Sequence, residues 1–290
     1  SLEDARYSAI VYKPSNIPNA SGPHVGDPRS GEILESHINW YHNVMRLLRN
    51  WYMIQASPSD ARARKPHFDD ELMGTLIRFV SSHEVGHTLG LPHNMGSSSS
   101  IPVEKLRDKA WVEANGHTPS IMDYARFNYV AQPEDNISPS GLYPRIGEYD
   151  LWSIEWGYKP ILDQTEEQEK QTLNEWVKAR FSNNKLRFLQ QDGIDPRSQT
   201  ECLGDNNMKA GEYGIKNLKW IVPKIQGWVN EKGENYETLT EIYNEVIGQF
   251  SRYNGHVLTN IGGIFTDSKT TDQDGGVFTV VPKSQQKEAL

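Results

Sequence analysis

Two histidines four residues apart, with a glutamate directly after the first, form the part of the sequence most suited to chemistry. They lie in the segment His83-Glu84-Val85-Gly86-His87. On a helix, residues four apart are offset by roughly 40° around the axis and about 6 Å along it, so both imidazoles project from one face toward a shared point. Glu84 would lie about 100° from His83, within reach of a water on a metal held there. The motif therefore predicts that His83 and His87 bind zinc and that Glu84 acts as a general base.

The residues that follow extend this motif and supply a third ligand. Gly90 and His93 complete the pattern H-E-x-x-H-x-x-G-x-x-H. On a straight helix His93 would lie about 9 Å beyond His87, too far to share one metal ion. Because glycine adopts a left-handed turn at little cost, Gly90 can end the helix and return His93 to the site. Three neutral imidazoles leave a fourth tetrahedral position for water, which is typical of a catalytic zinc site.

These residues resemble the signature of the metzincin clan of zinc endopeptidases. A second feature of the clan is a methionine-containing turn beneath the metal, and residues 120–124 (Ser-Ile-Met-Asp-Tyr) resemble it. The resemblance implies that Met122 forms the floor under the histidines without binding the metal. It also implies that Tyr124 lies near the zinc as a switchable ligand and oxyanion stabiliser. The alternative for Tyr124 is a buried tyrosine whose hydroxyl binds the backbone.

The resemblance also implies a domain organisation. Residues 147–158 are similar to the closing helix of the clan, with Asp150 near the start and an aromatic-glycine pair near the end. We therefore expect a metzincin-like catalytic domain over residues 1–160 and a mostly helical C-terminal domain of unknown role over residues 161–290. The whole chain is similar to bacterial metzincin-like peptidases that carry a helical extension. Asn94, after the third histidine, differs from the residue found in the better-known subfamilies.

The activity implied by the resemblance is zinc-dependent hydrolysis of peptide bonds, in particular by an endopeptidase with one catalytic Zn²⁺ and a protein or peptide substrate. Glu84 would take a proton from the metal-bound water, and Tyr124 would stabilise the oxyanion. A strand near residues 32–34 would be the edge strand on which an extended substrate aligns. Such peptidases usually act outside the cytoplasm, so we expect a secreted, periplasmic or cell-surface protein. Two alternatives stay open: a catalytically silent zinc-binding interaction module, and a zinc hydrolase of a non-peptide amide.

A helix must carry the first two histidines, and the sequence predicts one from about residue 69 to about residue 89. Apolar residues recur there at three- and four-residue steps, acids occupy the first turn, and Gly90 and a proline follow the end. Upstream, we expect a strand over residues 7–12, an edge strand near residues 32–34 and a helix over residues 38–54. The expected fold is α+β and zincin-like, with a small mixed sheet packed on the active-site helix and a mostly helical region after it.

Beyond residue 160, helical periodicity dominates the sequence. We expect an acidic helix capped by Thr165, a helix from about residue 208 to 220 ended by Pro223, and a helix along the apolar stripe of residues 239–253. Closer to the metal motif, the four serines at 97–100 indicate an exposed loop.

Charge and composition exclude several classes of partner. The chain has 290 residues, with 30 lysines and arginines against 38 acids, which gives a formal net charge of −8. This charge has the wrong sign for a protein that neutralises phosphates, so nucleic acid is not an expected partner. No apolar stretch approaches the roughly 20 residues that cross a bilayer, so we expect no transmembrane segment. The chain opens without a basic or apolar leader, so we expect any targeting segment to lie outside it.

The single cysteine and the other histidines have no motif around them. Cys202 excludes an intrachain disulfide, and we expect it to be buried and structural. The remaining histidines lack ligand spacing, and we expect them in ordinary surface or core positions: His24, His37, His42, His67, His117 and His256.

Overall fold

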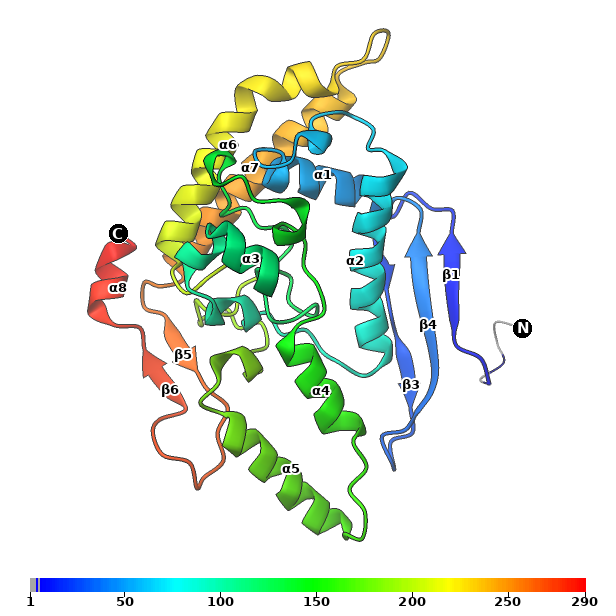
Figure 1. Cartoon of the computed structure of the whole chain (residues 1–290), viewed down its shortest axis with the longest axis vertical. Coiled ribbons are helices and arrows are strands. Elements are labelled where there is room, and N and C mark those ends of the chain that lie inside the picture. Colours follow the sequence, from blue (N-terminus) through cyan, green and yellow to red (C-terminus); the bar gives the residue numbers. More distant parts are fainter. Residues whose placement is uncertain (1–3, 5) are drawn as a thin grey trace.

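The computed structural model describes residue 4 and residues 6–290 and shows a mixed α/β chain (Figure 1). A small sheet forms one flank of the molecule, and helix α2 (Asp70–Thr88) lies beside it. Helices make up most of the remaining structure. The small mixed sheet packed on the helix that carries His83, followed by a mostly helical region, is the arrangement that the sequence predicts, and it is confirmed.

The four strands of this sheet surround a long central strand: β1 (Ala9–Lys13), β2 (Ala20–Ser21), β3 (His24–Gly26) and β4 (Ile33–Tyr41). β4 runs parallel to β1 on one side and antiparallel to β2 and β3 on the other. The strand expected near residues 32–34 is the first part of β4. Residues 33–36 pair with β3 on one side, and β1 pairs only with residues 37–41, so this part of the long strand has one strand partner among the described residues. β2 and β3 form the edge, and β2 contacts α2.

The helix expected over residues 38–54 begins later than predicted. Residues up to Tyr41 extend β4, and helix α1 runs over Val44–Ala56. Ser36, Ile38 and Trp40 are buried while the residues between them are partly exposed, which is the two-residue period of a strand with one covered face. The spacing of Ile38 and Tyr41 also fits a helical turn, and that coincidence explains the error.

Capping and burial set the position of α2. The Asp69 side chain accepts a hydrogen bond from the Leu72 backbone N–H at 2.9 Å and so caps the first turn. Leu72, Leu76, Phe79 and Val80 are buried in a cluster that includes the apolar face of α1. This burial fixes the rotation of α2, and the rotation decides where the histidines point.

The later elements are mostly helical: α3 (Lys109–Asn115), α4 (Glu148–Tyr158), α5 (Glu166–Arg180), α6 (Asn207–Val229), α7 (Glu237–Leu258) and α8 (Lys283–Glu288). A hairpin of β5 (Ile264–Thr266) and β6 (Phe278–Val280) precedes α8. Short 3-10 turns connect the elements at Ala61–Ala63, Ser97–Ser100, Val103–Leu106, Pro133–Asp135, Pro139–Gly141 and Asn184–Leu186. Thr165 caps α5 as predicted, and the stripe of residues 239–253 lies within α7.

The end of α6 differs from the prediction. Pro223 lies inside this helix, which continues to Val229. A proline inside a helix removes one backbone hydrogen bond. Ile221, Ile225 and Val229 are buried in the cluster that α6 shares with α7, and we attribute the continuation of the helix to this packing.

The four serines at 97–100 are not an exposed loop. They form a 3-10 turn in which Ser97 and Ser98 are buried. The Ser98 backbone N–H donates to Asp123 Oδ2 at 2.8 Å, and the Ser98 hydroxyl donates to the Cys202 carbonyl at 2.7 Å. The small side chains let this turn pack between two other segments.

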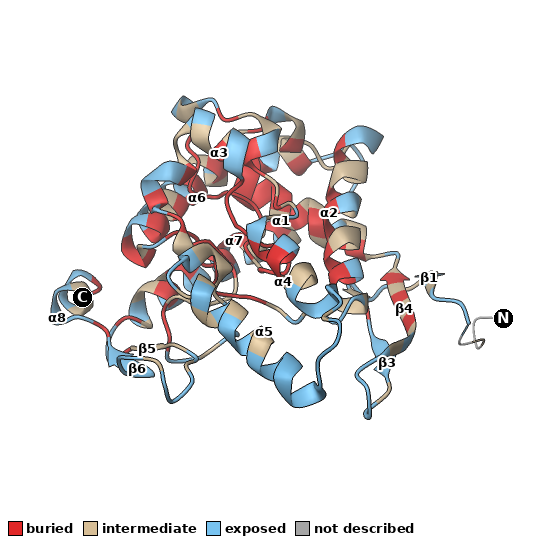
Figure 2. Ribbon diagram, turned by 60° about the horizontal axis from the view of Figure 1, so that its bottom comes forward, coloured by how far each residue is buried: buried red, intermediate tan, exposed pale blue. Residues whose placement is uncertain are grey.

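The interior joins the two halves of the chain. One buried cluster brings Met53 and Ile54 of α1 together with Ile221 of α6 and Ile242 of α7. Figure 2 shows the buried segments gathered where α1, α2, α6 and α7 meet. The domain division near residue 160 stays a prediction from the sequence, and helices on the two sides of it share a packed interior.

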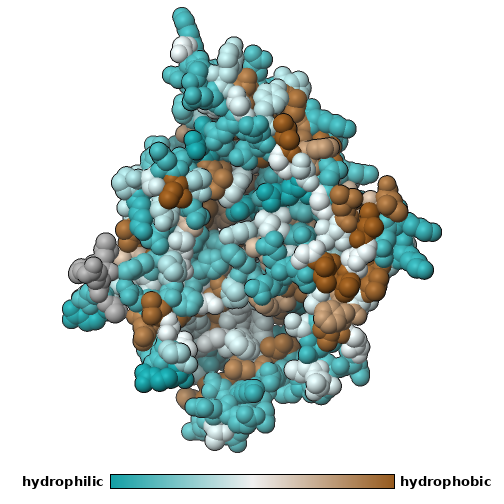
Figure 3. All heavy atoms as spheres, turned by 180° about the vertical axis from the view of Figure 1, so that it is seen from behind, coloured by the Kyte–Doolittle hydropathy of each residue, from teal (hydrophilic) through white to brown (hydrophobic). Residues whose placement is uncertain are grey.

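Among the described residues, no helix is long and apolar enough to cross a membrane. Seen from behind (Figure 3), apolar side chains gather near the β5–β6 hairpin and the C-terminal end of α7, where Leu258, Phe278 and Val280 are exposed. Cys202 is free and buried, as predicted.

Candidate metal centre

Three histidine side chains converge at the C-terminal end of α2. His83 and His87 lie on α2, and His93 lies on the segment that follows it. Gly90 has a φ of 84°, and its N–H donates to the His87 carbonyl at 2.9 Å. The left-handed turn predicted at Gly90 is therefore confirmed, and it brings His93 back to the other two rings.

The Nε2 atoms of the three rings lie at separations that suit one metal ion. His93 Nε2 is 3.2 Å from His83 Nε2 and 3.0 Å from His87 Nε2. Tetrahedral bonds of about 2.0–2.1 Å imply nitrogen–nitrogen separations of roughly 3.4 Å. The three residues that the sequence predicts as ligands therefore form a group that could hold a metal.

The backbone fixes the orientation of two of these rings. His83 Nδ1 donates to the Ile121 carbonyl at 2.7 Å, and His87 Nδ1 donates to the Leu91 carbonyl at 2.9 Å. Because each carbonyl needs a proton on Nδ1, the neutral ring keeps the Nε2 lone pair for a metal. Burial lowers the pKa of His83 to about 3 and the pKa of His93 to about 4, so both rings are neutral at pH 7. Neutral rings are the form that binds metal.

Glu84 lies beside this group in a buried position, with 6% of the residue exposed. Burial raises the pKa of Glu84 to about 7, although a hydrogen bond from the Gly22 backbone works in the opposite direction. The chain between β2 and β3 lies directly against α2 here, since a Cβ atom on Gly22 would overlap the Glu84 carbonyl oxygen. A carboxyl group with a pKa near 7 can both accept and release a proton at neutral pH.

Residues 120–124 form a buried turn against the helix that carries the ligands. Met122 is fully buried, and a Cβ atom on Gly86 would overlap the Met122 Sδ atom. The Met122 carbonyl accepts a hydrogen bond from the Asn94 N–H at 3.0 Å. The methionine thus contacts α2 between two histidines and the chain after the third, a position that agrees with the predicted floor.

Asp150, in the first turn of α4, supports this turn. Its Oδ1 accepts a hydrogen bond from the Ser120 hydroxyl at 2.7 Å, and its Oδ2 accepts from Ile121 N and Gly147 N, each at 2.8 Å. The backbone of Ile121 thus donates its N–H to Asp150 and accepts at its carbonyl from His83. The sequence marks Asp150 only as part of a helix start, and its contact with the partner of His83 is visible only in the structure.

Tyr124 packs on the histidine rings. The centroid of its ring lies 4.3 Å from that of His93 and 5.2 Å from that of His83. Burial raises the pKa of Tyr124, so its hydroxyl is protonated at neutral pH and can donate. Arg126 lies next to this ring, with its guanidinium carbon 4.3 Å from the Tyr124 centroid and 3.6 Å from the Trp51 centroid. No local signal in the sequence marks Arg126.

Asn94 ties the third ligand to a distant part of the chain. It is fully buried, its Nδ2 donates to the Arg187 carbonyl at 2.8 Å, and its Oδ1 accepts from Leu189 N at 2.8 Å. Gly96 follows at a close approach, because a Cβ atom there would overlap the Leu189 side chain. Asn94 therefore binds the chain after α5 through both polar atoms of its side chain.

The other histidines do not join the three ligands in the metal-binding group found among the described residues. His24 on β3 comes nearest, with its Nδ1 3.0 Å from the His87 carbonyl oxygen. His117 and His256 are buried, and His67 lies on the surface beside Glu231.

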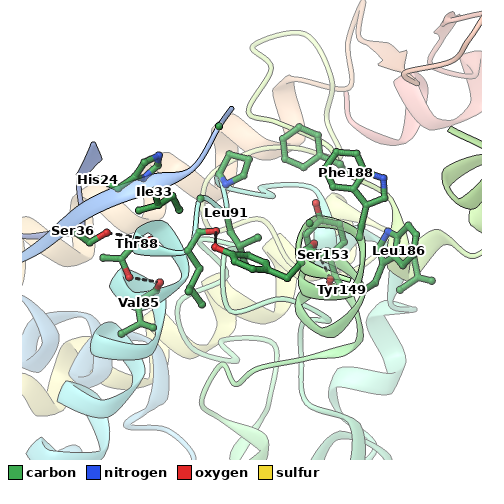
Figure 4. A pocket seen from close by; sticks show the side chains of 18 of the residues that line it. His24, Ile33, Ser36, Val85, Thr88, Leu91, Tyr149, Ser153, Leu186 and Phe188 are labelled. Atoms are coloured by element: carbon green, nitrogen blue, oxygen red, sulfur yellow. Dashed lines mark hydrogen bonds between the residues drawn. The ribbon is translucent and has the colours of Figure 1, made fainter. Parts of the chain in front are cut away.

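A cavity of about 1300 Å³ lies behind the end of α2. Figure 4 shows it between β4, the last turn of α2, α4 and the segment that carries Leu186 and Phe188. Val85 and Thr88 line it, and Val85 lies about 200° around the helix from His83. The cavity therefore borders the face of α2 that points away from the histidine ligands.

Comparison with known proteins agrees with this geometry. A family model described as Met-zincin matches residues 65–290, which is more than three quarters of the chain. The match includes all of α2, the three histidines, the methionine turn and every helix that follows. No curated protein and no solved structure matches the chain.

Proposed function

The chain belongs to the Met-zincin family, and we propose that it is a zinc-dependent peptidase that cleaves internal peptide bonds. The observation that carries this proposal is the convergence of three neutral histidines with a buried glutamate beside them. His93 Nε2 lies 3.2 Å from His83 Nε2 and 3.0 Å from His87 Nε2, and Glu84 lies on the helix that carries the first two histidines. Three histidine ligands leave a fourth position open, which distinguishes a catalytic from a structural zinc site.

The chemistry divides between the metal and the side chains. Zn²⁺, when bound by the three histidines, supplies a Lewis acid for the water and for the scissile carbonyl. Glu84 accepts a proton from the attacking water and donates it to the leaving amine, a use that its pKa of about 7 supports. Tyr124 donates a hydrogen bond to the negative charge that develops on the carbonyl oxygen, because its hydroxyl is protonated and its ring packs at a tilt against His93.

An extended substrate would align along the edge formed by β2 and β3. We assign this role to β2 and β3 in place of residues 32–34, because the chain of β2 and β3 lies against Glu84 and His87. The unpaired backbone groups of an edge strand can bind an extended peptide by strand addition. This geometry favours a peptide over a small amide as the substrate.

The test is cleavage of a mixed peptide library by the purified, zinc-loaded chain, read by mass spectrometry. We expect internal cleavage sites, and we expect Glu84→Gln to lower kcat by roughly 10²–10⁴-fold while zinc content stays unchanged. Glu155→Gln is the matched control: this acid on α4 is half-buried and pairs with Lys159 at the surface, and the variant should retain full activity. Zinc binding without cleavage would identify a silent binding module, and cleavage of small amides alone would identify a different hydrolase.

We also propose that the protein acts outside the cytoplasm. The support is the resemblance to peptidases whose substrates lie there; the buried free Cys202 is compatible with either compartment. Fractionation of cells that express the full-length gene product tests this directly, and recovery in the cytoplasm alone would refute it.

A further inference from the structure

Arg126, which is partly buried, and Glu201, which is buried, form an ion pair, and both have an unfavourable backbone conformation. Arg126 has a φ of 53° and Glu201 has a φ of 64°, backbone values that residues other than glycine seldom adopt. Backbone strain of this kind persists only where the surrounding structure imposes it, and it concentrates at functional sites. Arg126 lies two positions after Tyr124, and Glu201 lies in the segment before α6. Their contact therefore joins the candidate site to the C-terminal region.

The side chains of this pair extend to the face of Tyr124. Arg126 Nε lies 3.6 Å from Glu201 Oε1, and the side chains are 13% and 3% exposed. The guanidinium of Arg126 is held between the rings of Trp51 and Tyr124. An arginine placed over an aromatic face is attracted by the ring, and more strongly where water is excluded. The Tyr124 ring therefore contacts both the Arg126 guanidinium and the His93 ring.

The backbone of Glu201 holds the same tyrosine. The Glu201 N–H donates to the Tyr124 carbonyl at 2.9 Å. Glu201 Oε2 accepts from Gln55 Nε2 at 2.8 Å, and Gln55 Oε1 accepts from the Phe127 N–H at 3.0 Å. Glu201 therefore reaches the chain around Tyr124 by three routes: its own backbone, the Arg126 side chain and the Gln55 side chain.

We propose that Glu201 and Arg126 are positioning residues that hold the Tyr124 ring against His93, and that this is one role of the region after residue 160 in catalysis. The proposal rests on the peptidase function proposed above. It goes beyond the three ligands, Glu84 and Tyr124, because the proposed mechanism gives no step to Arg126 or Glu201. A buried ion pair can also serve stability alone, so the test must separate the two roles.

The experiment is a double-mutant cycle in the full-length, zinc-loaded protein. Arg126→Lys keeps the charge but loses the flat guanidinium, and Glu201→Gln keeps the shape but loses the charge. If these residues act through Tyr124, each lowers kcat by about tenfold with KM within twofold, and each changes kcat less than about twofold in a Tyr124→Phe background. Arg252→Gln is the matched control, because Arg252 Nε lies 3.6 Å from the same Glu201 oxygen; we expect it to leave kcat unchanged.

A second readout does not depend on activity. In metal-free protein labelled with ¹³C in the tyrosine rings, the Tyr124 resonance can be assigned among the 13 tyrosines by its loss in Tyr124→Phe. We expect Arg126→Lys and Glu201→Gln to shift this resonance and Arg252→Gln to leave it in place. Zinc content and melting temperature show that each variant is folded.

Each result decides the proposal. Equal losses of kcat in the presence and absence of the Tyr124 hydroxyl would overturn it, because the pair would then act independently of Tyr124. An unchanged Tyr124 resonance in both variants would also overturn it. If the two variants shift the Tyr124 resonance but the wild-type protein cleaves no peptide, the positioning of Tyr124 by this pair would be supported and the peptidase function refuted.

Discussion

Replacing Asp150 by alanine removes the acceptor that holds the methionine turn in place. The backbone N–H groups of Ile121 and Gly147 would lose their acceptor, the carboxylate of Asp150, a residue that is only 4% exposed. A buried donor left without an acceptor costs about 1–3 kcal/mol, so the two together should lower the free energy of unfolding by roughly 2–6 kcal/mol. Asp150→Asn can keep its oxygen toward both N–H groups, and we expect a loss of only about 1 kcal/mol.

The same substitution should weaken zinc binding. The Ile121 peptide connects Asp150 to the Nδ1 atom of His83, so loss of Asp150 frees the group that orients this ligand. Removal of such an outer partner lowers metal affinity by about 10–100-fold. We expect a loss in this range for Asp150→Ala and a smaller loss for Asp150→Asn.

Urea unfolding of the chelator-treated protein measures the first effect, and competition with a fluorescent zinc chelator measures the second. Glu155→Ala on the same helix is the control, because its ion pairs with Lys159 and Arg180 lie at the surface and should contribute little to stability. Equal stability and equal zinc affinity for the alanine and asparagine variants would show that the two backbone donors do not depend on Asp150, and would refute the reasoning.

Three further predictions concern packing, metal and pH. Gly86→Ala forces a Cβ atom into Met122 and should lower stability by roughly 1–3 kcal/mol in urea unfolding, whereas Gly74→Ala on the open face of α2 should be neutral or stabilising. Chelation should lower the melting temperature of the wild type in a thermal scan but not that of His93→Ala; a metal present at 1,000 times its Kd contributes about 4 kcal/mol. Burial lowers the pKa of His117 to about 4 from its usual 6.5, so the unfolded chain binds the proton first. The stability this provides is complete above pH 6.5 and is lost as the pH falls toward 4, a change of about 3 kcal/mol that His117→Gln should remove from the pH profile of urea unfolding.

The sequence predicts the metal group well because its geometry is local. The spacing of His83 and His87 follows from the helical repeat, and the return of His93 needs only a left-handed residue at Gly90. Asp69 and Thr165 cap their helices through side-chain bonds to residues three positions away. Such features depend on a few neighbouring residues, which the sequence contains in order.

Contacts between distant segments could not be predicted in this way. Ile38 fits the spacing of both a strand and a helix. It lies in a strand because β1 and β2 pair with β4, and these pairings join segments that are not neighbours in the sequence. Pro223 is tolerated inside α6 in a helix that packs on α7. Arg126 and Glu201 lie 75 positions apart, and no pattern of spacing connects them.

The two hydrogen bonds of Asn94 have a consequence for the order of folding. They close a loop of 93 to 95 residues between the third ligand and the chain after α5. Closing a loop of this length costs about 4 kcal/mol of chain entropy before the bonds form. During synthesis, the histidines leave the ribosome long before Leu189 does. The Asn94 side chain therefore reaches its final hydrogen bonds only after residues 187–189 have been made, later than α2 and the turn at Gly90, which need only neighbouring residues.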